Sequence, residues 1–377
     1  MLTYGMVGGG QGSFIGAIHR TAAELDHKAR FVAGALSSDP DRAVASAKNL
    51  GLADDRCYPT WEAMLEAERS RDDRIDFVSI VTPNHAHFAP AKAFIEAGFH
   101  VVIDKPMTVT SAQAEELEAL AAQHNVLCAV TYNYTGYPLV RQARELVRSG
   151  ELGEVRKVVV EYHQGWLATE LEATGMKQAE WRTDPAKAGA GGAIGDIGTH
   201  AENLISFVTG LELHSLCADL TTFVPGRRID DDASVLLRFA SGAKGTLSAS
   251  QVCVGERNNL TLRVFGQTGS LAWAQEEPNK LVFVTDDGIR ILTRGDDSLC
   301  DAAKDASRLP PGHPEAFFEA FANIYAGVIE AIGVKRGDVE ATSLSQLMPT
   351  AHEGTRGVRF VEKVVGSSNE GAVWVEA

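Results

Sequence analysis

The sequence has 377 residues, 45% of them hydrophobic and 23% charged, and its 35 Lys and Arg against 50 Asp and Glu give a formal net charge of −15. This composition excludes a disordered, collagen-like or coiled-coil chain, and the length indicates two or three domains of roughly 150 residues. The acidic balance argues against partners such as nucleic acid or an anionic membrane, because both attract an excess of Lys and Arg.

The cysteines are scattered, odd in number and never arranged as CxxC; they are Cys57, Cys128, Cys217, Cys253 and Cys300. This pattern favours reduced thiols over a disulfide framework or a zinc site. We expect neither a signal peptide nor a membrane span, because no basic region precedes the first apolar run and no run reaches about 18 apolar residues. The sequence therefore predicts a cytoplasmic protein.

The first third of the chain alternates short apolar runs with helical patterns. Strands are predicted at residues 2–7, 29–36, 75–81, 99–103 and 126–131. Helices are predicted between them, at residues 15–25, 41–50, 61–68, 88–97 and 111–124. Such alternation indicates right-handed βαβ units and a doubly wound parallel sheet of the Rossmann type, covered on both faces. We assign residues 1–131 to this dinucleotide-binding domain.

The pattern changes after about residue 150, where strands joined by hairpin turns predict a mostly antiparallel sheet. These strands are expected at residues 155–162, 233–240, 245–250, 260–265, 281–285 and 289–292. Helices are expected at residues 140–149, 200–209 and 314–332, and the glycine-rich stretch 187–198 is predicted to be a loop. The fold class is therefore α/β, with a second α+β domain over residues 132–377.

A glycine-rich turn follows the first predicted strand. Gly8 and Gly10 fit the start of the G-x-G-x-x-G pattern, whereas the next glycines, Gly12 and Gly16, imply about three extra residues in the turn. Glycines here let the backbone approach a pyrophosphate, and the following helix directs its N-terminus at that charge. We assign all four to cofactor binding; the alternative is a merely flexible turn.

The end of the second predicted strand normally carries a carboxylate that binds the ribose of NAD. Here Ser37 and Ser38 stand at that position with Arg42 behind them, and no carboxylate lies squarely at the strand end. These three residues could hold the 2′-phosphate of NADP, or Arg42 could be an ordinary solvated helix residue. NAD is favoured because no clear pair of basic residues is present, and NADP is not excluded.

Polar residues also follow the next two predicted strands: Thr82, Asn84 and His87 after one, and Asp104 and Lys105 after the other. Ligands of open α/β sheets lie beyond the carboxyl ends of the strands, so all five are expected at the cofactor site. The alternative for Lys105 is a solvated lysine at the end of a strand.

Several motifs occur together and in order: the glycine-rich turn, TPNHAHF, a strand running into DKPMT, Trp181-Arg182, and GGAIGDIGTH over residues 191–200. This combination resembles the Gfo/Idh/MocA oxidoreductases, and the resemblance covers essentially the whole chain. It implies an N-terminal Rossmann domain, a C-terminal α+β domain with a large open sheet, and pyridine-nucleotide chemistry on sugars, cyclitols or their derivatives. It also implies a homo-oligomer, a dimer or tetramer, assembled through that sheet.

The family motifs carry over residue by residue, with two departures. The E-K-P of the family appears as Asp104-Lys105-Pro106, a shortened carboxylate that should keep the lysine role, and its D-x-x-x-H matches Asp196 and His200. The departures are the missing ribose carboxylate and the longer glycine turn.

The longer turn affects one further motif. Residues 16–19, Gly-Ala-Ile-His, fit the G-x-x-H of the family only if the extra residues are allowed.

Three residues could carry out alcohol oxidation. His200 has an ordinary pKa of about 6.5 and suits removal of the hydroxyl proton. Asp196 could orient the imidazole, and Lys105 could stabilise the developing negative charge on oxygen. The structural alternatives are a helix N-cap for Asp196 and a first-turn histidine bonded to backbone for His200.

Aromatic and polar side chains suited to the face and hydroxyls of a sugar ring occur in the same part of the chain. Besides Lys105, Asp196 and His200, the substrate-binding candidates are Tyr134, Trp166, Trp181, Arg182 and His313. Core packing is the alternative for each aromatic residue. The histidines lack the spacing of a metal site, so no metal is expected.

The sequence thus predicts an NAD(P)-dependent dehydrogenase acting on a hydroxyl group of a small cyclitol, sugar or sugar derivative. The lack of a second basic cluster favours a neutral polyol ring over a sugar phosphate. Two alternatives remain: a non-catalytic dinucleotide-binding sensor, and an enzyme acting on non-sugar carbonyls or dihydrodiols.

Overall fold

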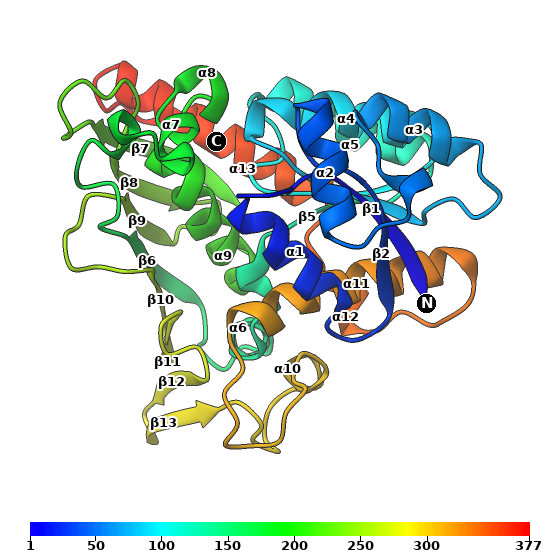
Figure 1. Ribbon diagram of the computed structural model, residues 1–377. Helices are drawn as coiled ribbons and strands as arrows, with labels where there is room; N and C mark the ends of the chain where they lie inside the picture. Colours follow the sequence, from blue (N-terminus) through cyan, green and yellow to red (C-terminus); the bar gives the residue numbers. More distant parts are fainter. The chain divides into compact units, whose positions relative to one another are not determined.

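The computed structural model describes residues 1–377, which form two compact units (Figure 1). Unit 1 comprises residues 1–108, 112–136 and 317–355, and unit 2 comprises residues 109–111, 137–316 and 356–377. Contacts thus group residues 317–355 with the first part of the chain, whereas the sequence analysis placed them in a continuous domain over residues 132–377.

Unit 1 contains a five-stranded, all-parallel sheet in the order β2-β1-β3-β4-β5, which confirms the predicted Rossmann-type sheet. Its strands are β1 (Leu2–Gly8), β2 (Ala29–Ala35), β3 (Phe77–Val81), β4 (His100–Ile103) and β5 (Cys128–Val130). The helices between them are α1 (Phe14–Glu24), α2 (Pro40–Asn49), α3 (Trp61–Arg69), α4 (Phe88–Glu96) and α5 (Ser111–Gln123). Every residue of β3 is buried, as expected for a parallel strand covered on both faces.

Two helices from late in the chain complete unit 1: α11 (Phe317–Arg336) and α12 (Ser343–Gln346). Phe321 and Tyr325 of α11 are buried in the core formed by β1, β3 and α1, which is why this segment returns to unit 1. By length and by a mean hydropathy of 1.4, α11 could cross a membrane, but 56% of that stretch is buried inside the protein. Burial of this kind is typical of a core helix.

Unit 2 contains a nine-stranded sheet in the order β13-β12-β11-β10-β6-β9-β8-β7-β14. Its strands are β6 (Val155–His163), β7 (Leu213–Thr221), β8 (Asp232–Phe239), β9 (Lys244–Ser250), β10 (Asn259–Gly266), β11 (Gly269–Ala274), β12 (Lys280–Thr285), β13 (Gly288–Thr293) and β14 (Val375–Glu376). All neighbouring pairs are antiparallel except β6 with β9, which confirms the predicted, mostly antiparallel sheet.

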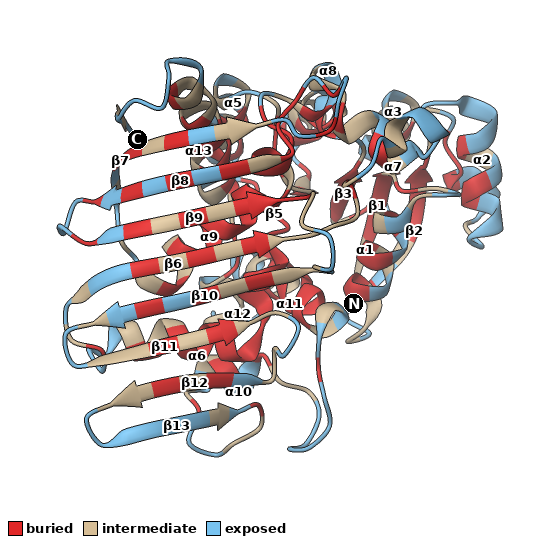
Figure 2. Cartoon of the chain, turned by 90° about the vertical axis from the view of Figure 1, so that its left-hand side faces the viewer, coloured by how far each residue is buried: buried red, intermediate tan, exposed pale blue.

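Helices of unit 2 cover one face of this sheet, where α9 (Thr199–Thr209) packs on the central strands β6, β9 and β10, and α6 (Pro138–Arg148) packs on β11 and β12. The other helices are α7 (Lys177–Arg182), α8 (Pro185–Ala188), α10 (Asp301–Asp305) and α13 (Ala351–Asn369), the last of which begins in unit 1. Figure 2 shows the opposite face, on which exposed or partly buried residues alternate with buried ones along strands such as β8 and β10. Its exposed apolar side chains include Leu236, Phe265, Ile289 and Ile291.

The prediction of a loop over residues 187–198 is wrong in its second half. Residues Ile194–Gly198 form a π-helical turn that continues directly into α9. Ile194 and Ile197 are buried, and the Asp196 amide donates to the Gly192 carbonyl at 2.8 Å, so apolar burial and backbone bonding order the segment. Asp196 is therefore inside a helical segment and is not its N-cap.

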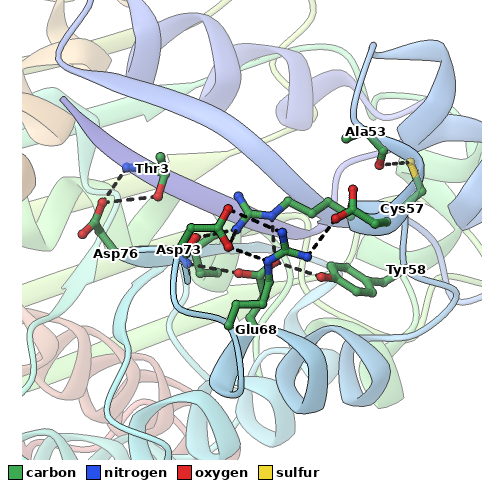
Figure 3. A network of polar contacts seen from close by, with 11 residues as sticks. Thr3, Ala53, Cys57, Tyr58, Glu68, Asp73 and Asp76 are labelled. Atoms are coloured by element: carbon green, nitrogen blue, oxygen red, sulfur yellow. Dashed lines mark hydrogen bonds and ion pairs between the residues drawn. The ribbon is translucent and has the colours of Figure 1, made fainter.

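The amino edge of the unit 1 sheet, where its strands begin, carries a dense polar network (Figure 3). Glu68 is fully buried and accepts hydrogen bonds from the Tyr58 hydroxyl at 2.9 Å and the Ile75 amide at 3.1 Å. Arg56 Nε lies 3.5 Å from the Glu68 carboxylate, and Asp76 accepts from the Thr3 amide at 2.6 Å. The polar groups of this edge thus bond to one another.

Candidate active site

The glycine-rich turn leaves β1 at the carboxyl edge of the unit 1 sheet, as predicted. Gly8 and Gly9 have φ angles of +80° and +73°, which favour glycine. A Cβ on Gly10 would lie 2.4 Å from the carbonyl oxygen of Leu36, so no larger residue fits there. At these positions the backbone itself, without side chains, lies at the carboxyl edge of the sheet.

Gly16 takes the place of the third glycine in the dinucleotide fingerprint. Helix α1 starts at Phe14 with Ser13 as its N-cap, and a Cβ on Gly16 would lie 2.2 Å from the Gly9 carbonyl oxygen. Gly16 therefore lets the helix pack directly on the turn, which is the role of that third glycine. Gly12 lies in the extra residues, where a Cβ would meet nothing within 4 Å.

Beyond β2, the Arg42 and Ser37 side chains are close together. Arg42 Nε donates to Ser37 Oγ at 2.9 Å, and Asp39 caps α2 by accepting from the Arg42 amide at 2.8 Å. Ser38 is exposed beside them. The only carboxylate at this strand end is thus engaged as a helix cap.

His87 links the turns that follow β3 and β4. Its Nδ1 lies 3.0 Å from the Pro106 carbonyl oxygen and its Nε2 lies 2.7 Å from that of Thr82. Burial lowers the pKa of His87 below its ordinary value. Asn84 is also buried, and it begins the short 3-10 turn Asn84–Ala86 that directly precedes His87 in the chain. A neutral imidazole carries one N–H, so His87 donates to one of these two carbonyl oxygens and lies beside the other.

Asp104 is the carboxylate next to Lys105. Its Oδ1 accepts from the Lys105 amide at 2.9 Å and from the Thr131 hydroxyl at 2.8 Å. Burial opposes its ionisation, but the nearby His19, Lys105 and His87 outweigh this and hold the pKa of Asp104 well below its usual range. The shortened family carboxylate is thus ionised and holds the backbone of the lysine.

A buried chain of side chains runs from Asp104 into the core of unit 1. His19 Nε2 lies 3.8 Å from Asp104 Oδ1, and His19 Nδ1 lies 2.7 Å from the hydroxyl oxygen of Tyr325. That hydroxyl lies 2.9 Å from Ser79 Oγ on β3. The histidine of the G-x-x-H segment therefore faces the carboxylate that precedes Lys105.

In unit 2, Asp196 is held by two side chains. Its Oδ2 accepts from Arg182 Nε at 3.2 Å and from Gln251 Nε2 at 2.9 Å. The Arg182 guanidinium also lies over the Trp181 ring, 4.1 Å from its centroid. Asp196, Arg182 and Trp181, predicted separately, thus belong to one cluster.

The cluster continues to Trp166 through residues that follow strand ends. Gln251 Nε2 lies 3.5 Å from Gln164 Oε1, which accepts from Trp166 Nε1 at 2.9 Å. Gln164 Nε2 donates in turn to Asn258 Oδ1 at 2.7 Å. We call the set Trp166, Trp181, Arg182, Asp196, Gln164, Gln251 and Asn258 the amide cluster.

His200 lies next to the amide cluster on α9. It is buried, and its ring centroid is 6.4 Å from that of Tyr162, whose hydroxyl donates to Asn258 at 2.7 Å. Asp196 and His200 are four residues apart on continuous helical backbone, a spacing that puts side chains on one face.

Two further predicted substrate residues are Tyr134 and His313. Tyr134 is buried in the 3-10 turn Asn133–Gly136 of unit 1. His313 is exposed in unit 2, in a segment where Glu315 accepts from the amides of Arg308 and Leu309. No described contact joins His313 to the amide cluster.

Sequence reasoning missed Gln164, Gln251 and Asn258. The first two directly follow β6 and β9, and Asn258 precedes β10. Because β6 and β9 are parallel and β10 is antiparallel to β6, these positions meet at one edge of the sheet. The strand-end rule applied to unit 1 would have found them. No group of three or more His, Cys, Asp or Glu side chains is placed to hold a metal ion.

Comparison with known proteins matches both parts of the chain. Residues 2–132 match an oxidoreductase family with an NAD-binding Rossmann fold, and residues 140–272 match a GFO/IDH/MocA C-terminal domain. An uncharacterised oxidoreductase of Bacillus subtilis, YfiI, is 35% identical over 100% of this chain and 96% of its own length.

A ligand or an activity is known for two relatives. The crystal structure of an inositol dehydrogenase homologue from Azotobacter vinelandii, complexed with NADH and myo-inositol, has a TM-score of 0.92 and 38% identity, covering 100% of this chain and 97% of its own. A levoglucosan dehydrogenase of Pseudarthrobacter phenanthrenivorans is 27% identical over 74% of this chain and 75% of its own length.

Proposed function

The chain belongs to the Gfo/Idh/MocA oxidoreductase family, and from this premise we propose that it is an NAD-dependent dehydrogenase of a hydroxyl group on a neutral polyol ring, such as an inositol or a sugar. The observation that carries the proposal is the amide cluster, which gathers a carboxylate, amides and two tryptophans beside His200. Unit 1 supplies the NAD-binding fold.

Each unit contributes a distinct task. In unit 1, the backbone of Gly8, Gly9 and Gly10 fits a pyrophosphate, because the turn has no room for side chains at its close contacts. A bound nicotinamide supplies the acceptor for the hydride that leaves the substrate carbon. Lys105 donates to the reacting oxygen and stabilises its negative charge.

His200 removes the hydroxyl proton. An imidazole is the side chain best suited to take up a proton near neutral pH. Asp196, on the same helical face, stabilises the imidazolium that results. Arg182 and Gln251 hold the carboxylate of Asp196, so its orientation does not depend on substrate.

A neutral ring is favoured by the charges of unit 2. Arg182 is paired with Asp196, and the buried Arg227 is paired with Glu172 and Asp231. Neither arginine is thus available as part of a phosphate site, whereas Gln164, Gln251 and Asn258 match the hydroxyls of a polyol. The relative bound to myo-inositol and the levoglucosan dehydrogenase support this substrate class.

The test is a panel of inositols, aldoses, anhydrosugars and glycosides, each offered with NAD and with NADP. We expect turnover with a few members and a steep loss of rate with deoxy analogues, because buried polar groups are then left without partners. Faster turnover of aliphatic alcohols, 2-hydroxy acids or dihydrodiols would contradict the substrate class. Binding of NAD and polyol without turnover would favour the sensor alternative.

Cofactor preference is tested by fluorescence titration. We expect NAD to bind more tightly than NADP, because Arg42 is a single basic residue already bonded to Ser37. NADP binding tenfold tighter, about 1.4 kcal/mol, would instead assign Ser37, Ser38 and Arg42 to its 2′-phosphate.

We further propose a cytoplasmic homo-oligomer, a dimer or tetramer that assembles through the open face of the unit 2 sheet. Ile289 is 72% exposed and Ile291 60% exposed on this face, together with Leu236 and Phe265. These apolar side chains lie on a sheet face that no helix of unit 2 covers, and association through that face would remove them from water. The five cysteines are free, which suits a reducing compartment. Light scattering at micromolar concentration would test the assembly; a monomer would contradict it.

A further inference from the structure

Three consecutive backbone amides in the GGAIGDIGTH segment are bound by one residue, Asp230. The Gly192 amide donates to Asp230 Oδ1 at 2.6 Å, and the Ile194 amide donates to Oδ2 at 2.9 Å. Between them, the Ala193 amide donates to the backbone oxygen of Asp230 at 3.0 Å. Asp230 lies between β7 and β8 and is buried. Burial raises the pKa of Asp230, while the two backbone amides, one on each carboxylate oxygen, favour its ionised form.

These amides form the entry to the helix that carries Asp196 and His200. The π-helical turn begins at Ile194, and the Asp196 amide donates to the Gly192 carbonyl at 2.8 Å. A Cβ on Gly192 would lie 2.1 Å from the Asp230 backbone oxygen, so the close approach requires glycine. The first amides of a helix have no partner within it, and a carboxylate placed there fixes where the helix starts.

Resting on the proposed function, we propose that Asp230 is a positioning residue, which sets the start of the helix 194–209 and thereby the place of Asp196 and His200. No sequence motif identified it, because its partners lie 36 to 38 residues earlier in the chain.

The next residue, Asp231, serves a different segment. Its carboxylate accepts from the amides of Phe223 and Val224, at 2.8 and 3.0 Å, and pairs with Arg227. Arg227 donates to the Leu167 carbonyl in the segment after Trp166. Two neighbouring carboxylates thus hold two separate parts of unit 2, and only Asp230 contacts the helix entry.

The test compares Asp230→Asn with a matched control. The amide keeps the size of the carboxylate but points an NH2 group at one of the two backbone amides, so one hydrogen bond is lost. We expect kcat to fall by about tenfold or more, with an unchanged Kd for NAD. The control is Glu68→Gln in unit 1, which likewise replaces a buried carboxylate that accepts a hydrogen bond from a backbone amide. This variant should have a lower thermal stability than the wild type but an unchanged kcat.

A double-mutant cycle separates positioning from general damage. If Asp230 acts by placing Asp196 and His200, adding Asp230→Asn to His200→Ala should change kcat by less than about twofold, because the base that Asp230 positions is already absent and coupled residues are not additive. Full additivity in this cycle, or a kcat for Asp230→Asn within twofold of the wild type, would overturn the proposal. Gly192→Ala is the second variant: it keeps Asp230 but pushes the helix entry away, and it should reproduce the same kinetic pattern.

Failure of the proposed function is recognised separately. If the wild-type chain turns over no polyol, the function fails, and hydrogen exchange still tests positioning. Asp230→Asn should then accelerate exchange of the amides at residues 192–200 relative to the rest of unit 2, and Glu68→Gln should not. Unchanged exchange in that segment would overturn the positioning role whatever the activity.

Discussion

The two edges of the unit 1 sheet use polar residues in opposite ways. At the amino edge, Glu68 is fully buried, accepts from Tyr58 and Ile75, and lies beside Arg56. At the carboxyl edge, the close contacts are made by backbone at glycines, and the backbone of Lys105 is held by its neighbour Asp104. The amino edge is closed by side chains bonding to one another, whereas the carboxyl edge orders a backbone surface. Substitutions at the two edges should therefore separate stability from activity.

The largest effects are expected at Lys105, on the carboxyl edge of the unit 1 sheet, and at His200 and Asp196 in unit 2. Lys105→Met should reduce kcat by about 100-fold or more, because the charge on the reacting oxygen loses its donor. His200→Ala should do the same, with Asp196→Asn between these variants and the wild type. Steady-state kinetics measure kcat, and titration with NAD measures its Kd. The Kd for NAD should change much less than kcat. Near wild-type turnover of His200→Ala from pH 6 to 9 would assign the base elsewhere.

The matching change at the amino edge should affect stability alone. Glu68→Gln leaves one of its partners without an acceptor inside the protein and should lower the free energy of unfolding by about 2 kcal/mol. Urea denaturation measures this loss. A fall in kcat of more than about twofold would show that the amino edge also affects activity, so the two edges of the sheet would not separate stability from activity.

A smaller effect is expected in the glycine turn. Gly16→Ala puts a Cβ 2.2 Å from the Gly9 carbonyl oxygen, so the turn must move and the Kd for NAD should rise by about tenfold. Gly366→Ala in α13 is the control, because a Cβ there meets nothing within 4 Å. Equal NAD affinity in the two variants would mean that Gly16 does not shape the cofactor site.

The smallest effect is a pH dependence at the start of β4. His100 Nδ1 accepts from the Leu127 amide at 2.9 Å, which requires a neutral ring, and burial together with Arg336 and Lys335 lowers its pKa to about 4. The unfolded chain therefore binds a proton that the folded chain does not between about pH 6.5 and 4, so the free energy of unfolding falls as the pH is lowered through that range.

Replacing the imidazole should remove this dependence. Unfolding of His100→Asn should become less sensitive to acid than that of the wild type, since an amide oxygen can still accept from Leu127. Urea titrations at pH 7, 5.5 and 4.5 compare the two proteins. Parallel stability curves would contradict the assignment.

Local patterns were enough to predict most of unit 1. Continuous apolar runs located β3 and β4, and the rule that ligands lie at carboxyl strand ends placed Thr82 and Lys105 at the same edge as the glycine turn. Gly16 was predicted to belong to the turn despite its irregular spacing, and in the structure the packing of α1 leaves no room there for a side chain. These features depend on residues close together in the chain or on neighbouring strands.

Features that depend on distant contacts were not predicted. The bond between Tyr325 and His19 joins residues 306 positions apart, and no periodicity in α11 indicates which unit it completes. The same holds for Asp230 and the helix entry. The π-helical turn at Ile194–Gly198 was predicted to be a loop because its glycines are unfavourable in a helix, whereas hydrogen bonds from the Gly192 and Ile194 amides to Asp230 order its start.

The return of α11 to unit 1 sets an order in time for synthesis of this protein. At about 5 to 20 residues per second, the ribosome needs about 10 to 40 seconds to extend the chain from the end of β5 to Tyr325. During that interval Ser79 and His19 lack their buried partner, and the apolar side of α1 has no α11 to cover it. Unit 1 can therefore complete its core only after most of unit 2 has been synthesised. Until then its apolar residues need to be covered by chaperones or by the growing chain itself.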